Sequence, residues 1–206
     1  MNSVMLRGIA AEAAEVNHIS HEARFYRLWL DVSRLSGKVD RLRVLLPEEV
    51  LGGLNPAAGD GLEVTGQMRT YNNKTGIGGR LIVSALAREI TPRNGEPVNR
   101  LFVSGTLCRA PSYRKTPLGR EICDIMLAVP RSYNRTNYLP LIAWGGAARV
   151  CAQMETGQPL FAEGRFQSRA YTKQLGEETV GMTAYEVSVL RLAVSEEELQ
   201  ELATDS

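Results

Sequence analysis

The chain has 206 residues, 44% of them hydrophobic, which supports folded cores and excludes an intrinsically disordered protein. No apolar run approaches the roughly 20 residues that cross a bilayer, and the N-terminal residues lack the pattern of a secretory signal, so we expect no membrane association. The formal net charge is +1, but residues 196–206 hold five acidic and no basic residues, which leaves 18 acidic against 24 basic residues, or +6, in residues 1–195. A basic body with an acidic end occurs in nucleic-acid binders and also on ordinary protein surfaces.

The first half of the chain reads as five strands and one short helix. Apolar and polar residues alternate, or β-formers cluster, in residues 4–9, 25–32, 42–47, 62–71 and 81–86. Residues 48–54 favour a short helix that ends at glycines and at Asn55-Pro56. Residues 72–80 read as a hairpin tip, and residues 91–97 have the turn chemistry of a linker.

The second half repeats this order. Its predicted strands are residues 101–107, 121–129, 138–144, 159–171 and 183–190, with a helix at 147–154 before the fourth strand. Strand-interior glycines, which mark bends or bulges, recur at a near-constant interval: Gly105 lies 97 residues after Gly8, and Gly164 lies 98 residues after Gly66.

This element order is that of the OB-fold, a five-stranded Greek-key barrel. The sequence therefore predicts an all-β protein with two OB-folds in tandem, each with a short helix. We expect domains at 1–91 and 98–192, followed by an acidic tail at 193–206. Leu192, Leu199 and Leu202 favour a short amphipathic helix near this tail.

Four motifs of the second half occur in an order that points to one family. They are Gly105-Thr106-Leu107, the basic loop 113–119, a strand with Tyr138 and Trp144 near its ends, and Glu163-Gly164-Arg165 followed by Arg169 and Tyr171. Residues 101–190 thereby resemble the bacterial single-stranded DNA-binding protein family, in its tandem OB-fold form. The resemblance implies a homodimer that binds single-stranded DNA without catalysis or strong sequence preference, in DNA replication, recombination or repair.

Single strands are bound by ring faces that stack on bases and by cations that neutralise phosphates. The candidate stacking residues are Tyr133, Tyr138, Trp144 and Tyr171. The candidate phosphate contacts are Arg114, Lys115, Arg120, Arg131, Arg135, Arg165, Arg169 and Lys173, with Lys74 and Arg80 in the first half. Two alternatives stay open: Trp144, in an apolar strand, is as compatible with the core as with the binding groove, and Tyr171 could simply cover the barrel end.

The first half matches only the skeleton of the family. At an offset of 98, Asp40 and Leu46 stand where the second half has Tyr138 and Trp144. We therefore expect the second barrel to bind most of the DNA and the first to serve assembly. The chain also lacks the acidic tip ending in Pro-Phe with which the family recruits partners, so a partner-recruiting role is not expected.

Enzymatic and metal functions have little support. His18 and His21, spaced H-x-x-H, have only Glu15 and Glu22 as neighbouring ligand types, and no phosphate-loop or nucleophile motif occurs, so we expect no enzyme, no metal and no cofactor. Three widely spaced cysteines, Cys108, Cys123 and Cys151, read as reduced thiols of a cytoplasmic protein. The alternative function is a replication-accessory, primosome-like OB protein whose barrels chiefly bind other proteins.

Overall fold

The structure, a computed structural model, describes residues 1–20, 22–73, 81–175 and 178–204. The chain forms two compact units. One contains Val4–Asn99 and Gln167–Tyr185, and the other contains Met1–Ser3, Arg100–Phe166 and Glu186–Ser206. These units differ from the expected ranges 1–91 and 98–192 chiefly in Gln167–Tyr185, a segment of the second half that groups with the first.

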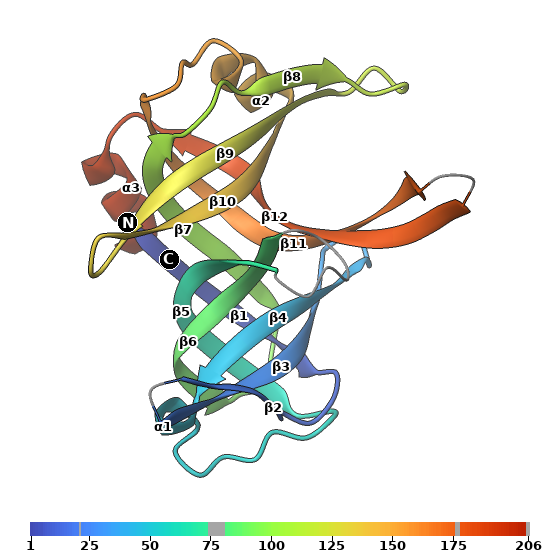
Figure 1. The fold of residues 1–206 in the computed structure, drawn as a ribbon, viewed down its shortest axis with the longest axis vertical. Helices are drawn as coiled ribbons and strands as arrows, with labels where there is room; N and C mark the ends of the chain where they lie inside the picture. The colour runs from blue at the N-terminus through green and yellow to red at the C-terminus, as the bar shows by residue number, and fades with distance from the viewer. Residues whose placement is uncertain (21, 74–80, 176–177, 205–206) are drawn as a thin grey trace. The chain divides into compact units, whose positions relative to one another are not determined.

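The first unit holds a closed barrel of five strands (Figure 1). The strands are β1 (Asn2–Ala10), β3 (Ala23–Ser33), β4 (Val39–Pro47), β5 (Gly61–Asn72) and β6 (Leu81–Pro92). Antiparallel β1 pairs with both β3 and β5, β3 pairs with β4, β5 pairs with β6, and the parallel pair β4–β6 closes the ring. Helix α1 (Glu48–Leu51) follows β4, and the edge strand β2 (Glu15–Ser20) pairs with β3.

The second unit holds a barrel of the same connectivity (Figure 1). Its strands are β7 (Val98–Leu107), β9 (Glu121–Arg131), β10 (Arg135–Trp144), and the parts of β11 (Pro159–Leu175) and β12 (Glu178–Ala193) outside Gln167–Tyr185. Here β7 pairs with β9 and β11, β9 with β10, and β11 with β12, while the parallel pair β10–β12 closes the ring. Helix α2 (Gly145–Cys151) follows β10, and β8 (Ser112–Lys115) pairs with the outer edge of β9. The prediction of two tandem OB-folds is confirmed.

Side-chain alternation fills each barrel with an apolar core. In β3 the inward residues Leu28, Leu30 and Val32 are at most 1% exposed, and the residues between them are partly exposed. Burial of each such side chain stabilises the fold by about 1.5–3 kcal/mol relative to exposure. The outward residues are thereby left free to form surfaces on strands that the core holds rigid.

The first glycine pair of the sequence marks the point where the first strand of each barrel crosses the second. A Cβ atom on Gly8 would lie 2.3 Å from the carbonyl oxygen of Asp31, and one on Gly105 would lie 2.5 Å from that of Ala128. Because Cβ atoms do not approach other atoms so closely, only glycine permits these crossings.

The second glycine pair is explained by the same steric exclusion, between the fourth and fifth strands of each barrel. A Cβ atom on Gly66 would lie 2.1 Å from the carbonyl oxygen of Leu86, and one on Gly164 would lie 2.6 Å from that of Ser188. The near-constant spacing in the sequence therefore reflects one steric requirement, met twice.

Several local features differ from the sequence expectations. The structure has two further strands, β2 and β8, where the sequence indicated a polar stretch and a basic loop. Both are edge strands of mostly exposed residues, so their sequences show no alternation of apolar and polar residues. Helices α1 and α2 end before the predicted 48–54 and 147–154 do, and β6 and β12 are longer than predicted. Most of the hairpin tip at 72–80 lies outside the described residues.

The acidic tail contains a helix, α3 (Glu196–Thr204), which confirms the expected amphipathic helix. Leu199 on this helix is fully buried and packs with Phe102 and Ala193. The backbone oxygen of Leu202 accepts a hydrogen bond of 2.9 Å from Arg100. The apolar side of α3 is therefore docked on its own unit. None of the described helices is long and apolar enough to cross a membrane.

Candidate nucleic-acid interface

One candidate surface is the outer side of strands β9 and β10. In β10 the residues Asn137, Leu139 and Leu141 are buried, whereas Tyr138 and Trp144 at intervening positions are 51% and 37% exposed. Trp144 therefore faces outward at the end of its strand, which answers the open question of core or groove in favour of the exposed face. We call Tyr138, Trp144 and their neighbour Arg114 the second-barrel face.

Strand β8 brings Arg114 to this face. Ile122 of β9 is the register partner of Trp144 on one side and of Arg114 on the other, so the three side chains form one cross-strand row. The guanidinium of Arg114 donates a hydrogen bond of 2.9 Å from Nε to Asp124 Oδ2. Because both members of this ion pair are partly exposed, the attraction is weak enough for another anion to compete for Arg114.

Glu121, beside this row, neutralises further cations. It accepts a hydrogen bond of 2.6 Å from the hydroxyl of Tyr113 and pairs with Arg149. The hydrogen bond from Tyr113, together with the charges of Arg149 and Lys115, lowers the pKa of Glu121 and keeps it ionised. Lys115 and Arg149 thus face a local carboxylate, so the positive field at this end of the face is smaller than the sequence count suggests.

Among the predicted stacking residues, Tyr133 in the hairpin between β9 and β10 has the most exposed ring. Tyr133 is 93% exposed, and both Tyr133 and Asn134 have positive φ, at 59° and 52°. Positive φ is costly for a residue with a bulky side chain. Arg131 and Arg135, which flank the tip, are direct register partners, and like charges placed opposite one another repel. An anion bound between them would relieve that repulsion.

Other predicted residues lie on other elements. Arg120 is exposed in the turn 116–120, where its backbone N–H donates 3.0 Å to Thr116 Oγ1. Arg165 is partly buried in β11. In the unit of the first barrel, Arg169 lies over the ring of Tyr171 at 5.9 Å, and the Tyr171 hydroxyl donates to Met182 Sδ at 3.6 Å.

Three predicted cations cannot be placed. Lys74 and Arg80 lie outside the described residues, and the side chain of Lys173 is likewise not described. The structure thus places most predicted residues of the second half on β8, β9, β10 and the β9–β10 hairpin, leaves Arg120 in a turn and Arg165 on β11, and assigns Arg169 and Tyr171 to the other compact unit.

Sequence reasoning missed a comparable surface on the first barrel. The outward positions of β3 are Phe25, Arg27 and Trp29, and Trp29 is the register partner of Arg43 on β4. The ring of Tyr185 lies beside Trp29, with centroids 6.0 Å apart and planes tilted by 37°. We call these five residues the first-barrel face. The alternation within residues 25–32 already places the first three on one side of the strand, so the sequence pattern contained the signal for them.

The cations of the first-barrel face differ in how they are neutralised. Arg27 lies over the Trp29 ring at 5.9 Å and donates to Glu15 at 2.8 Å. Arg43 donates from Nη2 to the neutral side-chain oxygen of Asn17 at 2.7 Å and forms no ion pair with a described residue. Burial, followed by the charge of Arg27, lowers the pKa of Arg43. This guanidinium is therefore held in an environment that lacks negative charge.

Polar clusters elsewhere do not form a metal site. His18 is part of β2, and its ring stacks on Phe25 with centroids 4.8 Å apart. His21 lies outside the described residues. Within the described part of the chain, no three His, Cys, Asp or Glu side chains are placed to hold a metal. Cys123 and Cys151 are free and buried, and burial raises the pKa of the Cys151 thiol to about 12.

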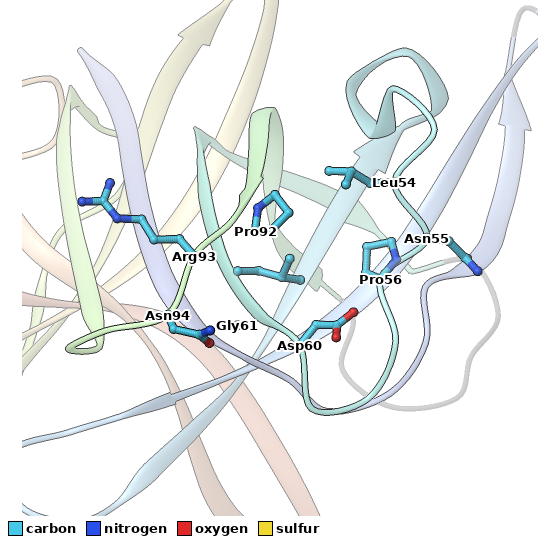
Figure 2. Close-up of a pocket in the computed structure, with 9 residues that line it drawn as sticks. Leu54, Asn55, Pro56, Asp60, Gly61, Pro92, Arg93 and Asn94 are labelled. Atoms are coloured by element: carbon cyan, nitrogen blue, oxygen red, sulfur yellow. The ribbon is translucent and has the colours of Figure 1, made fainter.

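A hollow of about 330 Å³ lies at the end of the first barrel, where the loop after α1 meets the start of β5 and the end of β6 (Figure 2). Its polar groups serve local structure: Asp60 accepts a hydrogen bond of 2.8 Å from the backbone of Ala57, and Arg93 donates 2.9 Å to Glu63. None of the predicted site residues lines it.

Comparison with known proteins adds an independent observation. Residues 98–193 match the model of the single-strand binding protein family. The second half of this chain is thus similar to that family, and the first half lies outside the match. The matched range begins with β7 and ends with β12, so it covers the whole second barrel and every residue of the second-barrel face.

Two curated proteins that match part of the chain are named single-stranded DNA-binding proteins. A single-stranded DNA-binding protein of Thermus thermophilus is 32% identical over 90 residues, covering 42% of this chain and 34% of that protein. One of Neisseria meningitidis is 27% identical over 99 residues, covering 44% of this chain and 55% of that protein. The chain thus spans only about a third to a half of the length of these relatives.

A solved structure extends the likeness to both barrels. The wild-type single-stranded DNA binding protein from Thermus aquaticus superposes with a TM-score of 0.73 at 24% identity, over 94% of this chain and 92% of that one. At this identity the likeness shows the fold alone. The two-barrel fold of this chain therefore also occurs in that solved protein.

Proposed function

We propose that this chain binds single-stranded DNA without strong sequence preference, in DNA replication, recombination or repair in the cytoplasm. The observation that carries the proposal is the second-barrel face, where Tyr138 and Trp144 are exposed on β10, the third strand of an OB-fold, beside its second strand β9. That side of an OB-fold is its usual oligonucleotide surface. The family match over residues 98–193 supports the same ligand and favours it over the primosome-like alternative.

The chemistry of this face suits an unpaired strand. Each base stacked on a ring contributes about 1–3 kcal/mol, and stacking does not depend on base identity. Arg114 and the opposed pair Arg131 and Arg135 would contact phosphates, which carry no sequence information. A duplex hides its bases from such rings, so duplex DNA would engage only the cations. The proposal assigns no catalytic role to the chain.

Titration with a fluorescent oligo-dT, at two salt concentrations and beside a duplex of equal length, tests this function. We expect saturable binding to oligo-dT, clearly weaker binding to the duplex, and loss of affinity as salt rises, because bound cations release counterions. Tyr133→Ala is a useful companion variant, because its ring is almost fully exposed and its loss leaves the core intact. Equal affinity for both DNAs would indicate a generic basic surface and overturn the proposal.

We also propose that the chain assembles as a homodimer. Strand β2 is an edge strand with Val16 and Ile19 58% and 65% exposed, and unpaired strand edges favour pairing with another chain. Closed twofold assembly is the commonest oligomer among soluble proteins. Light scattering of the intact chain should give the mass of a dimer, and a monomeric mass at working concentration would remove this part of the proposal.

A further inference from the structure

We propose that Asp40, paired with Arg34, is a positioning residue for the binding of single-stranded DNA. The pair holds the segment Gln167–Tyr185 of the second half on the first barrel and thereby fixes the ring of Tyr171. The inference rests on the proposed function, because it concerns how one predicted contact of that function is held in place. It gives residue 40 a role that the sequence comparison of the two halves, which shows only a missing ring there, does not contain.

Strand β11 passes from one compact unit to the other. Its residues up to Phe166 belong to the unit of the second barrel, and from Gln167 onward they belong to the unit of the first barrel. Ser168 is the second residue after this change. A chain segment keeps one position only where contacts offset the conformational entropy of ordering it. The contacts of Ser168 therefore help to decide where the segment lies.

Asp40 provides such contacts from inside the first barrel. It lies on β4, and its side chain is fully buried. Its Oδ1 atom accepts a hydrogen bond of 2.9 Å from the backbone N–H of Ser168 and one of 3.1 Å from the hydroxyl of the same residue, 128 positions away in sequence. A buried carboxylate without enough donors is costly, so the barrel and the segment stabilise each other.

Arg34 compensates the buried charge of Asp40. Its Nε and Nη2 atoms each donate a hydrogen bond of 2.5 Å, to Oδ2 and Oδ1 of Asp40, and its side chain is only 16% exposed. The Nη2 atom also donates to the backbone oxygen of Ser168 at 3.4 Å. The hydrogen bonds to Asp40 outweigh burial and raise the pKa of Arg34, which keeps its guanidinium charged. One ion pair thus binds both the N–H and the C=O of Ser168.

The segment that this pair holds carries a ring predicted to stack on bases. Tyr171 is partly exposed three residues after Ser168, and the guanidinium of Arg169 lies over its ring at 5.9 Å. The Tyr171 hydroxyl donates to Met182 Sδ at 3.6 Å and so joins the two strands of the segment. Binding is stronger when such a ring is ordered before the ligand arrives, because less entropy is lost on association. The anchor at Ser168 provides this order.

Two double variants separate the hydrogen-bond acceptor of Asp40 from its charge. Arg34→Met with Asp40→Leu removes the ion pair and also the acceptor for Ser168. Arg34→Gln with Asp40→Asn removes the ion pair but keeps an amide oxygen at residue 40 that can accept from Ser168. Neither variant leaves a buried charge unpaired, and apolar replacement of a buried ion pair is often neutral for stability. Both leave the net charge unchanged. Urea unfolding checks that the fold persists.

Hydrogen exchange measures whether the segment is held. Backbone amides of residues 167–175 should exchange at least about tenfold faster in Arg34→Met/Asp40→Leu than in the wild type, because local opening becomes easier. In Arg34→Gln/Asp40→Asn they should exchange nearly as in the wild type. Ser168→Ala, which removes only the hydroxyl bond, should raise their exchange about threefold, and it serves as the test if the apolar variant does not fold. Amides of β9 are the internal reference. Wild-type exchange of residues 167–175 in all three variants overturns the inference.

A double-mutant cycle with oligo-dT tests the positioning role. Tyr171→Leu should weaken binding roughly tenfold in the wild-type background, through the lost ring, and less than about twofold in the Arg34→Met/Asp40→Leu background, where the ring is no longer held. Arg34→Met/Asp40→Leu by itself should weaken binding about as much as Tyr171→Leu does, and Arg34→Gln/Asp40→Asn should restore the affinity to within about twofold of the wild type. Trp144→Ala on the second-barrel face is the matched control and should weaken binding by the same factor in both backgrounds.

The outcomes separate this inference from the proposed function. If Tyr171→Leu weakens binding equally in both backgrounds, or not at all, the positioning role is overturned and the proposed function stands. Faster exchange of the segment without loss of affinity has the same meaning. If the effect of Trp144→Ala also changes between the backgrounds, the apolar variant disturbs the whole chain, and the inference is overturned. Absence of oligo-dT binding in the wild type contradicts both.

Discussion

Replacement of Gly105 by alanine should destabilise the second barrel and disturb its binding face together. The new Cβ atom would lie 2.5 Å from the carbonyl oxygen of Ala128 and 2.9 Å from Cγ of Leu127, whereas an ordinary contact begins near 3.4 Å. Strands β7 and β9 would have to separate by roughly 0.9 Å at a backbone atom, which cannot rotate away. Overpacking of this kind costs about 1–3 kcal/mol. Ala128 is the register partner of Tyr138, so the displaced strand carries part of the second-barrel face.

Urea unfolding and oligo-dT titration of the full chain measure the two effects. Gly146→Ala in helix α2 is the matched control in the same unit, since the only atom within 4 Å of its added Cβ is the Nη2 end of Arg149, at 3.9 Å. Alanine in a helix is favoured over glycine, so Gly146→Ala should leave stability unchanged or raise it by up to about 1 kcal/mol. If the free energy of unfolding of Gly105→Ala lies within about 0.5 kcal/mol of the wild-type value, the close crossing does not constrain the barrel and the explanation of the repeated glycines is wrong.

Three further predictions concern binding and pH. Trp144→Ala should weaken oligo-dT binding by about 1–3 kcal/mol in a fluorescence titration. Val150 on α2 is 57% exposed, and Val150→Ala should leave the affinity unchanged. If Trp144→Ala instead unfolds the barrel, Trp144 has a core role. The logarithm of the affinity should fall linearly with the logarithm of salt concentration, by about 0.7 per phosphate contact, and a flat response would show that the cations do not bind phosphate. Burial by itself would raise the pKa of Glu63, but the hydrogen bonds and charges of Arg7 and Arg93 outweigh it, and the net pKa is lowered. The ionised carboxylate of Glu63 therefore stabilises the first barrel at pH values above its ordinary pKa of 4.5. That stabilisation is lost as the pH falls through the lower pKa that Glu63 has in the folded state. The melting temperatures of wild type and Glu63→Gln should therefore differ at about pH 7 and converge on acidification.

Local chemistry made much of the architecture predictable. Alternation marks the barrel strands because their inward side chains must be apolar, and the glycines at Gly8, Gly66, Gly105 and Gly164 recur because each crossing excludes a Cβ atom. Exposed edge strands have no such requirement. For that reason β2 and β8 were not predicted.

The predicted rings Tyr133 and Tyr138 could be found because polar surroundings or alternation leave them no place in a core. The side that Trp144 faces was not predictable, since the residues before it, Leu139–Ala143, are apolar on both sides of the strand, and only the 37% exposure of its side chain in the folded barrel shows that it faces outward.

The sequence by itself determined the barrel count, the order of the barrel strands and the family resemblance of the second half, because these depend on periodicity and on motifs within short stretches of chain. Only the tertiary structure decided how residues far apart in sequence combine. Asp40 bonds Ser168 across 128 residues, and Trp29 meets Tyr185 in the same compact unit. A comparison of the halves at a fixed offset could not detect this, since it aligns each residue with its counterpart and not with its neighbour in space. The physical reason is that a long strand pair can leave the barrel in which it begins, and the hydrogen bonds at its far end then decide which surface its side chains complete.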